Sequence, residues 1–192
     1  KLIEQLPVNS PIQVYTDNAR YYPYGSAAAH TLGYVVSSLD ISEEGVPGEE
    51  LTTFSLKGKQ GKAGLERSFE EYLQGESGGQ IWRVDPAGFQ YECVEQKNPT
   101  QGEDLICSLD IDLQRAAEQA IRGKTGAVVA IEVASGEVLT LASSPTYNLN
   151  DLTPYIPTAV YNDINERGAW INRAIQGLYP PGSPFKMITA SA

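Results

Sequence analysis

Apolar and polar residues alternate along two stretches in the middle of the chain. The stretches are 80–85 and 89–94, and a Pro-Ala-Gly sequence lies between them at 86–88. Alternation with period two predicts strands with one buried face, and proline and glycine mark the turn that joins them. We therefore expect a hairpin here, followed by a third strand over 104–109.

A second hairpin is predicted further along the chain. Residues 126–133 and 138–142 are rich in valine, leucine and alanine, and the sequence Ala-Ser-Gly-Glu joins them at 134–137. Apolar residues are adjacent here, which is typical of a strand buried on both faces. The turn between two such runs makes this the strongest hairpin signal in the sequence.

Helical spacing of apolar residues occurs in two stretches, 64–73 and 112–121. The first is followed by Gly75 and the second by Gly123, and glycine commonly ends helices. The expected apolar faces are Leu65, Phe69, Tyr72 and Leu73 in the first helix, and Leu113, Ala117, Ala120 and Ile121 in the second. We expect the first helix to pack on the sheet of the 80–94 hairpin.

The remaining stretches have less regular patterns. Residues 26–32 are alanine-rich and favour a helix that Gly33 ends, and residues 34–36 favour a strand. Residues 1–25 contain several prolines and predict strands and loops, whereas 37–59 predicts a polar, acidic connection. Together these patterns predict an α+β chain.

The chain is acidic, with 14 basic and 24 acidic residues among 192 and a formal net charge of -10 at pH 7. An acidic surface gains no counterion-release energy from a polyanion, so this charge argues against nucleic acid and anionic membranes as partners. No apolar run approaches the roughly 18 residues that a membrane-spanning helix needs. The first residues also carry no charged-then-apolar signal segment, so we expect the chain as given to be soluble.

Two cysteines and one histidine are too few for the common zinc frameworks, so no structural metal is expected. A hairpin symmetric about position 100 would set Cys93 opposite Cys107 and permit a cross-strand disulfide. The alternative is a pair of reduced cysteines in the core, and the sequence leaves both open. His30 is interpreted as a packing or capping histidine, and Glu66 either as an ion-pair partner or as a solvated helix charge.

A serine and a lysine stand three positions apart near the end of the chain. They are Ser183 and Lys186, directly after a Pro-Pro-Gly turn. If Ser183 opens a helix, the two side chains share one face, so the amine can accept the hydroxyl proton during acyl transfer. Free N–H groups at the helix start would also face a developing oxyanion. A serine-proline pair is equally an ordinary helix start, so this motif alone does not decide.

Five blocks, in order, resemble the class B penicillin-binding proteins, in particular their elongation type. The blocks are YPYG with AAHTLGYV within 22–35, GKAGLE at 61–66, LDIDLQ at 109–114, GAVVAIEVASGEVLTLASSP at 126–145, and NRAIQGLYPPGS at 172–183. The last block leads directly into the serine-lysine motif. Under this resemblance, Ser183 is the expected nucleophile and Lys186 the expected base.

The resemblance implies two domains. Residues 1–110 would form a non-catalytic pedestal (dimerisation-type) domain, N-terminally incomplete, and residues 111–192 the start of a transpeptidase domain. The intact protein would be a peptidoglycan D,D-transpeptidase that acts on stem peptides, is acylated by penicillin and other β-lactams, and uses no cofactor. The resemblance also implies an anchor in the inner membrane, a catalytic face on its periplasmic side, and a glycan polymerase and cell-shape scaffold proteins as partners.

Two further motifs of this family, S-x-N and K-T-G, should follow Ser183, and the sequence reaches Ala192 without them. Lys124-Thr125-Gly126 spells K-T-G but precedes Ser183, so we interpret it as a turn and strand start. A lysine that acts as a base must be neutral, which needs burial and neighbouring positive charge. We therefore expect the chain by itself to be inert toward penicillin. The alternatives are a partner-docking module and, with a poorer match to the first blocks, a β-lactam sensor or β-lactamase.

Overall fold

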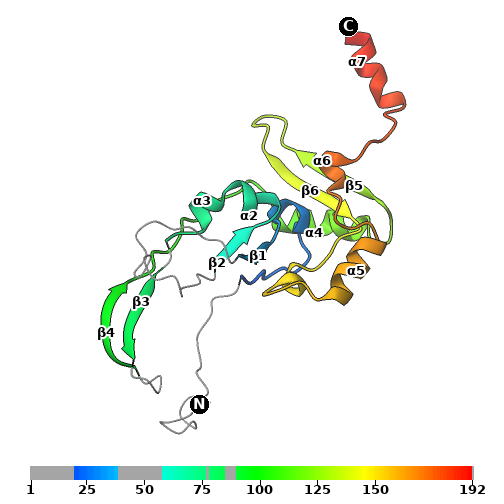
Figure 1. Ribbon diagram of the computed structural model, residues 1–192. Coiled ribbons are helices and arrows are strands. Elements are labelled where there is room, and N and C mark those ends of the chain that lie inside the picture. Colours follow the sequence, from blue (N-terminus) through cyan, green and yellow to red (C-terminus); the bar gives the residue numbers. More distant parts are fainter. Residues whose placement is uncertain (1–19, 39–57, 77, 85–89, 192) are drawn as a thin grey trace.

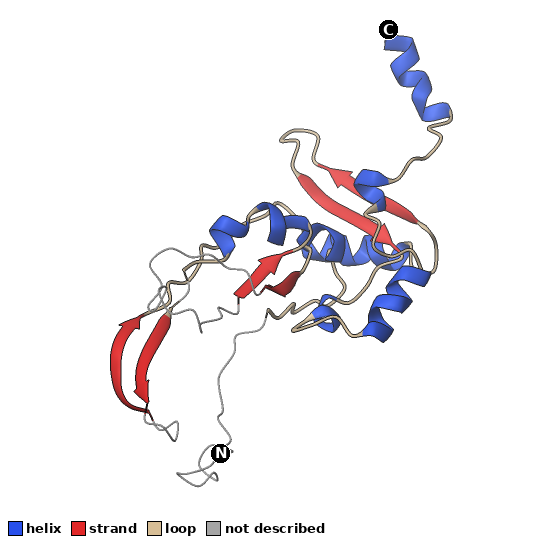
Figure 2. Cartoon of the chain, in the orientation of Figure 1, coloured by secondary structure: helices blue, strands red, loops and turns tan. Residues whose placement is uncertain are grey.

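The computed structural model describes residues 20–38, 58–76, 78–84 and 90–191 (Figure 1). Within them, three separate two-stranded antiparallel sheets are accompanied by short helices (Figure 2). Strands and helices both occur along the chain, and the expected α+β class is confirmed. The predictions for the first 19 residues, for 39–57 and for the turn at 86–88 lie outside the described residues.

The first sheet pairs β1 (Val35–Ser38) with β2 (Gly58–Gly61). α1 (Ala29–Leu32) precedes β1, and Gly33 ends this helix with φ 77°, so the predicted helix and strand on either side of Gly33 are confirmed. β2 was not predicted, because its sequence Gly-Lys-Gln-Gly has no apolar alternation.

The helix expected over 64–73 is interrupted. It forms α2 (Gly64–Ser68) and α3 (Glu70–Leu73), separated at Phe69, which has φ -119° and ψ 27°. α2 packs on β2, so the prediction that this helix packs on the 80–94 hairpin is wrong. The contact is close because Gly61 has no side chain: a Cβ there would lie 2.1 Å from the backbone oxygen of Glu66.

The predicted hairpin at 80–94 is confirmed as β3 (Gly79–Val84) and β4 (Gln90–Lys97). The third strand predicted over 104–109 is wrong, because these residues form no regular element. The residues on either side of this stretch are held elsewhere: the N–H of Glu103 donates to the Tyr72 carbonyl at 2.6 Å, and that of Asp110 donates to the Leu139 carbonyl at 2.9 Å.

The expected symmetry about position 100 is also wrong. β4 pairs with β3, so Cys93 lies opposite Trp82 instead of Cys107. Thr100 instead bridges to Glu76. Both cysteines are free thiols, which agrees with the reduced alternative and not with the disulfide, but both are exposed, so the expected core position is wrong.

The predicted helix over 112–121 is confirmed as α4 (Ile111–Ala120). The Asp110 carboxylate caps it, accepting hydrogen bonds from the N–H groups of Asp112 and Leu113, each at 2.9 Å. The expected apolar face is partly wrong, since Leu113 is 47% exposed whereas Gln114 is fully buried.

Gln114 is buried because its amide completes the edge of the next sheet. Its Oε1 accepts from the N–H of Leu141 at 2.8 Å, and its Nε2 donates to the Leu141 carbonyl at 3.2 Å. Its Nε2 also donates to Glu118 at 2.7 Å. A polar side chain that satisfies its hydrogen bonds in this way can be buried without penalty.

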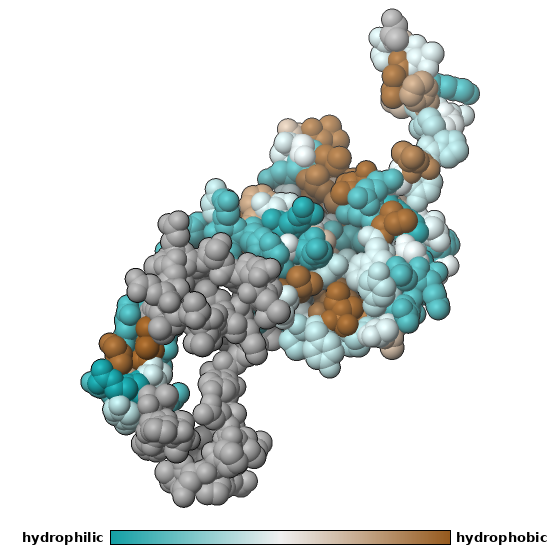
Figure 3. Space-filling model, viewed as in Figure 1, coloured by the Kyte–Doolittle hydropathy of each residue, from teal (hydrophilic) through white to brown (hydrophobic). Residues whose placement is uncertain are grey.

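The third sheet is the predicted hairpin of β5 (Gly126–Ile131) and β6 (Val138–Ser144). The expectation of a strand buried on both faces is wrong for β5, because Val129 and Ile131 are 46% and 55% exposed. β6 is the buried strand, and β5 lies outside it. Apolar side chains therefore gather on the surface over this hairpin (Figure 3).

The hydrophobic core of the described residues joins segments from both ends of the sequence. Its buried members are Tyr22, Ala29, Tyr147, Leu149, Leu152, Ile164 and Ala169. They come from the α1 region, from η2 (Leu149–Leu152) and from α5 (Thr158–Glu166) and the turn that follows it.

Backbone groups strengthen this junction. The Asn150 amide bonds both the N–H and the C=O of Tyr22, at 2.9 and 2.8 Å, and the Leu149 N–H donates to Gly25 at 3.3 Å. The segment that begins at Arg20 is thus held against residues more than 100 positions later.

Candidate functional site

Ser183 and Lys186 lie on two consecutive helical elements. Ser183 begins the 3₁₀ helix η3 (Ser183–Phe185), and Lys186 begins α7 (Lys186–Ser191). Gly182 precedes them with φ 58°, and Pro184 holds the second position of η3. Because side chains three apart eclipse in a 3₁₀ turn, this local geometry favours a serine and a lysine on the same side.

The Ser183 hydroxyl has no hydrogen-bond partner among the described residues. Other hydroxyls of the same segment bond back to their own helix: Thr189 donates to the Phe185 carbonyl at 3.3 Å, and Ser191 donates to Ile188 at 2.9 Å. Ser183 therefore differs from Thr189 and Ser191 in having a hydroxyl that is not bonded to its own helical segment.

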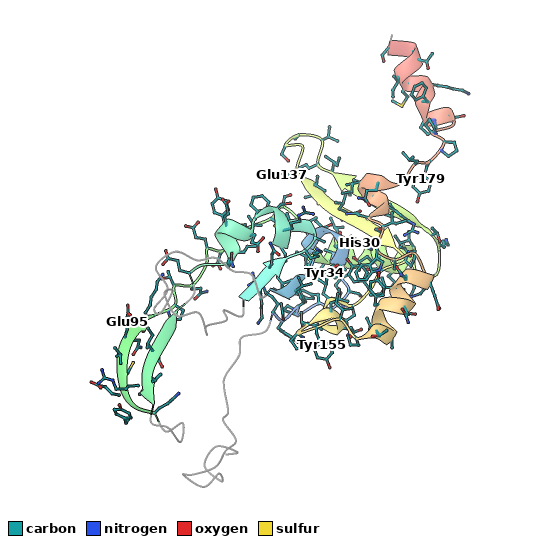
Figure 4. The ribbon with its side chains drawn as sticks, in the orientation of Figure 1. His30, Tyr34, Glu95, Glu137, Tyr155 and Tyr179 are labelled. Carbon is teal, nitrogen blue, oxygen red and sulfur yellow. The ribbon has the colours of Figure 1, made fainter. Side chains whose placement is uncertain are left out.

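The segment that carries both residues extends away from the rest of the chain. The chain leaves α6 (Arg173–Gln176), passes Tyr179 and continues into α7, which projects outward (Figure 4). Ser183 and Lys186 are both exposed. Ser183 and Lys186 thus lie three positions apart on one exposed segment, and the described residues form no cleft around them.

The K-T-G sequence at 124–126 lies at the start of β5. The Ser144 hydroxyl donates to the Lys124 carbonyl at 2.6 Å, and Gly126 pairs with Ser144 across the sheet. The interpretation of this sequence as a turn and strand start is confirmed.

His30 is buried and serves packing, as predicted. Its Nε2 lies 2.6 Å from the Ala169 carbonyl, to which it donates, and its ring meets Tyr147 edge-on with centroids 5.1 Å apart. Burial lowers the pKa of His30, partly offset by the bond to Ala169. The ring is therefore neutral near pH 7 and far from the serine-lysine segment.

Glu66 forms a partly buried ion pair, which is one of its two expected roles. Its carboxylate binds the Arg20 guanidinium through two contacts of 3.0 Å and accepts from the Tyr22 hydroxyl at 3.2 Å. Burial first, and the Glu66 carboxylate second, raise the pKa of Tyr22. The partners lie more than 40 positions away in sequence, which is why sequence patterns did not identify Arg20.

Neither a metal site nor a membrane span is found in the part of the chain that the structure describes. No group of three or more His, Cys, Asp and Glu side chains there could hold a metal ion. No described helix is long and apolar enough to cross a membrane.

Two family models match the chain. Residues 2–107 match the penicillin-binding protein dimerisation domain, and residues 126–192 match the penicillin-binding protein transpeptidase domain.

Several curated proteins are similar over nearly the whole chain. Peptidoglycan D,D-transpeptidase MrdA of Acinetobacter baumannii is 35% identical over 181 residues, which are 93% of this chain and 26% of that protein. MrdA of Escherichia coli K12 is 34% identical over 184 residues, which are 93% of this chain and 29% of that protein.

Solved structures agree with the sequence comparison. Penicillin-binding protein PBP2 of Helicobacter pylori, in complex with MreC, superposes with a TM-score of 0.65 and 33% identity, covering 88% of this chain and 31% of that one. PBP2 of Pseudomonas aeruginosa, in complex with WCK 5153, gives a TM-score of 0.67 and 30% identity, covering 93% and 34%. The chain spans about a quarter to a third of the length of these relatives.

Proposed function

Because this chain belongs to the penicillin-binding protein family, we propose that the protein carrying it is a peptidoglycan D,D-transpeptidase of cell-wall synthesis with Ser183 as nucleophile. The observation that supports this most directly is the free Ser183 hydroxyl at a helix start, one 3₁₀ turn before Lys186. The chain is divided at about residue 110 into a pedestal, 1–110, and the opening part of a transpeptidase domain, 111–192.

The proposed reaction is acyl transfer in two steps. The Ser183 Oγ attacks the carbonyl carbon of the penultimate D-Ala of a stem peptide, and Lys186 accepts the hydroxyl proton. The bond to the terminal D-Ala breaks, and this residue leaves as an amine that takes a proton. An amine from a second stem peptide then attacks the acyl-enzyme, which forms the cross-link and releases Ser183. A β-lactam acylates the same oxygen because its ring amide resembles the donor.

The chain by itself is proposed to be inert. Both reacting side chains are exposed to water, whereas acyl transfer is favoured by N–H donors fixed around the oxyanion in a site that excludes water. Such preorganised donors usually supply the largest share of catalysis in acyl transfer. The reaction therefore needs further residues around Ser183 and Lys186, beyond those that the structure describes.

Acylation of the intact protein by a fluorescent penicillin tests the assignment. Ser183→Ala should abolish covalent labelling, and Lys186→Gln should slow it by about 100-fold or more, the usual contribution of a general base. Ser191→Ala is the matched control, since it removes a hydroxyl from the same helix that bonds only to Ile188. Labelling that persists in Ser183→Ala would refute the site.

The proposed setting follows the relatives. The Helicobacter pylori protein was solved with MreC, which supports a cell-shape scaffold protein as a partner of the intact protein, and a glycan polymerase is proposed as a further partner from the family resemblance. Its location is proposed as the inner membrane, with the catalytic face on the periplasmic side.

A second candidate function is a non-catalytic docking module. The exposure of the β3–β4 hairpin favours it, since Trp82, Tyr91 and Val94 are 39%, 57% and 55% exposed. An intact protein that binds its scaffold partner but never labels with penicillin would support the module over the enzyme.

A further inference from the structure

A polar groove lies between α4, the turn at 24–27 and the end of β6. Its volume is about 980 Å³, near the upper end of the range for ligand sites. One face of α4 and the turn after it form a wall, and Arg115, Gln119 and Arg122 follow one another along that wall at helical spacing. The groove is separate from Ser183 and Lys186, neither of which lines it.

The charge of this groove is opposite to that of the chain. Its lining contains four basic residues, Arg115, Arg122, Lys124 and Arg167, and two acidic residues, Asp112 and Glu118. The whole chain has 14 basic and 24 acidic residues. Basic side chains thus gather here although they are the minority elsewhere.

Two of the charged groups in the groove are already engaged. The Glu118 carboxylate accepts hydrogen bonds from the Ala28 N–H and from Gln114, each at 2.7 Å. Arg167 binds Asp163 at 2.6 and 3.0 Å and also donates to the Thr146 carbonyl.

Three exposed cations remain available. Within the described residues, Arg115, Arg122 and Lys124 make no ion pair and no side-chain hydrogen bond. The Lys124 carbonyl is held by the Ser144 hydroxyl, so the backbone at this corner of the groove is fixed while the amine is free.

The distance between Arg115 and Arg122 determines how far apart the carboxylates of a ligand that binds both must lie. Arg115 lies five residues before the end of α4 at Ala120 and Arg122 lies two residues past that end, so at about 1.5 Å per helical residue the two are roughly 10 Å apart along the wall. A polyproline-II segment rises about 3.1 Å per residue with three residues per turn, so carboxylates at positions i and i+3 lie about 9 Å apart on one side. Guanidinium groups bind such carboxylates with paired hydrogen bonds.

We propose that this groove binds a short acidic peptide segment in an extended, polyproline-II conformation, with carboxylates three residues apart facing Arg115 and Arg122 and with Lys124 beside one of them. A long polyanion is disfavoured, because beyond the groove it would run over the surface of a chain with net charge -10. The inference goes beyond the transpeptidase proposal and does not depend on it.

Fluorescence anisotropy with the intact protein tests the proposal. The ligand is a fluorescein-labelled peptide Gly-Glu-Pro-Pro-Glu-Gly, and the reference peptide has glutamine in place of both glutamates. We expect the glutamate peptide to bind and the Arg115→Gln/Arg122→Gln variant to weaken binding by about tenfold or more, the effect of losing charge-assisted hydrogen bonds. Equal binding of the two peptides, or none by the wild type, would overturn the proposal.

A matched variant separates the groove from general electrostatics. Arg83→Gln/Lys97→Gln changes the net charge equally on the β3–β4 hairpin, where these cations pair with Glu92 and Glu76. It should bind the peptide within about twofold of the wild type. Equal weakening of peptide binding by both double variants would refute the proposal. The proposal would also fail if an oligothymidylate displaced the labelled peptide more strongly than the unlabelled peptide does. If circular dichroism shows that Arg115→Gln/Arg122→Gln does not fold, Lys124→Gln is tested in its place. We expect Lys124→Gln to weaken peptide binding, and unchanged binding would refute the proposal.

Discussion

At the scale of single residues, the burial of His30 makes one proton important for stability. The ring is enclosed by Tyr147 and the Ala169 carbonyl, and burial lowers its pKa below the ordinary value of 6.5. The charged ring is therefore less stable in the folded chain than in the unfolded chain. Since the sequence contains one histidine, any histidine-linked effect on stability belongs to this residue.

We predict that the free energy of unfolding falls as the pH drops below about 6.5. A group whose pKa is lowered by folding binds its proton more readily when unfolded, so its stabilising effect is present above the unfolded pKa and is lost as the pH falls toward the folded pKa. The slope for one proton is at most about 1.4 kcal/mol per pH unit. Urea unfolding at pH 7.5, 6.5 and 5.5 measures it.

The control for this prediction is His30→Gln. Its amide can still donate to Ala169 but does not titrate, so the dependence between pH 7.5 and 5.5 should become flatter. An equally steep slope in this variant would assign the effect to carboxylates instead.

Sequence reasoning predicted the kind of role that some residues have but not the partners far along the chain that complete it. The packing role of His30 was predicted, and one of the two roles expected of Glu66 is the one that the structure shows. The burial of Gln114 was missed, because its partner is the Leu141 backbone, 27 positions later, and a polar residue gives no signal in an apolar pattern.

At the scale of elements, close backbone contacts decide where helices and strands lie. Gly33 ends α1 with φ 77°, and a Cβ there would lie 1.8 Å from the backbone oxygen of Ala63, beside the start of α2. Two elements thus meet with no room for a side chain. This contact fixes how α1 and α2 approach each other.

We predict that Gly33→Ala destabilises the chain by about 3 kcal/mol or more, because it combines a left-handed backbone with a backbone clash. Gly123→Ala is the matched control: its φ is 75°, but its Cβ would meet nothing within 4 Å. That variant should lose only about 1–2 kcal/mol. Chemical denaturation of both variants tests the difference, and equal losses would show that the clash is relieved by movement.

The elements that were predicted correctly have strong local patterns, as in α4, β3, β4, β5 and β6. The strand expected over 104–109 failed for a different reason. The residues that flank it, Glu103 and Asp110, donate to the Tyr72 and Leu139 carbonyls, and no described strand pairs with the stretch between them. A sequence pattern indicates that a segment favours the strand conformation, but it does not show whether a neighbouring strand is present to pair with it.

At the scale of the whole molecule, the core connects the two ends of the sequence. Tyr22 and Ala29 pack with Leu149, Leu152 and Ile164, so the region around α1 shares its core with the region around α5. We infer that these regions unfold together although the proposed division near residue 110 would separate them in sequence. A shared core gives neither region enough buried apolar surface to be stable alone.

We predict that Leu149→Ala lowers the stability of both regions by the same amount, about 2–5 kcal/mol, since Leu149 is fully buried. Trp170 fluorescence in a Trp82→Phe background reports on one region. Hydrogen exchange of the Leu32 and Gly33 amides, which bond to Ala28 and Ala29, reports on the other.

Val94→Ala serves as the control, because this residue is 55% exposed on the β3–β4 hairpin and its loss should change neither reporter by more than about 0.5 kcal/mol. A shift in Trp170 fluorescence without faster exchange at Gly33 would show that the two regions are independent.

The two free thiols give a practical means of following the hairpin. Cys93 lies on β4 and Cys107 lies in the stretch that leads to α4, and both side chains are accessible. Nitroxide or dye labels attached to Cys93 and Cys107 would report the distance between the β3–β4 hairpin and the stretch that leads to α4, without any introduced cysteine. A change in this distance when a partner protein is added would show spectroscopically that the hairpin moves.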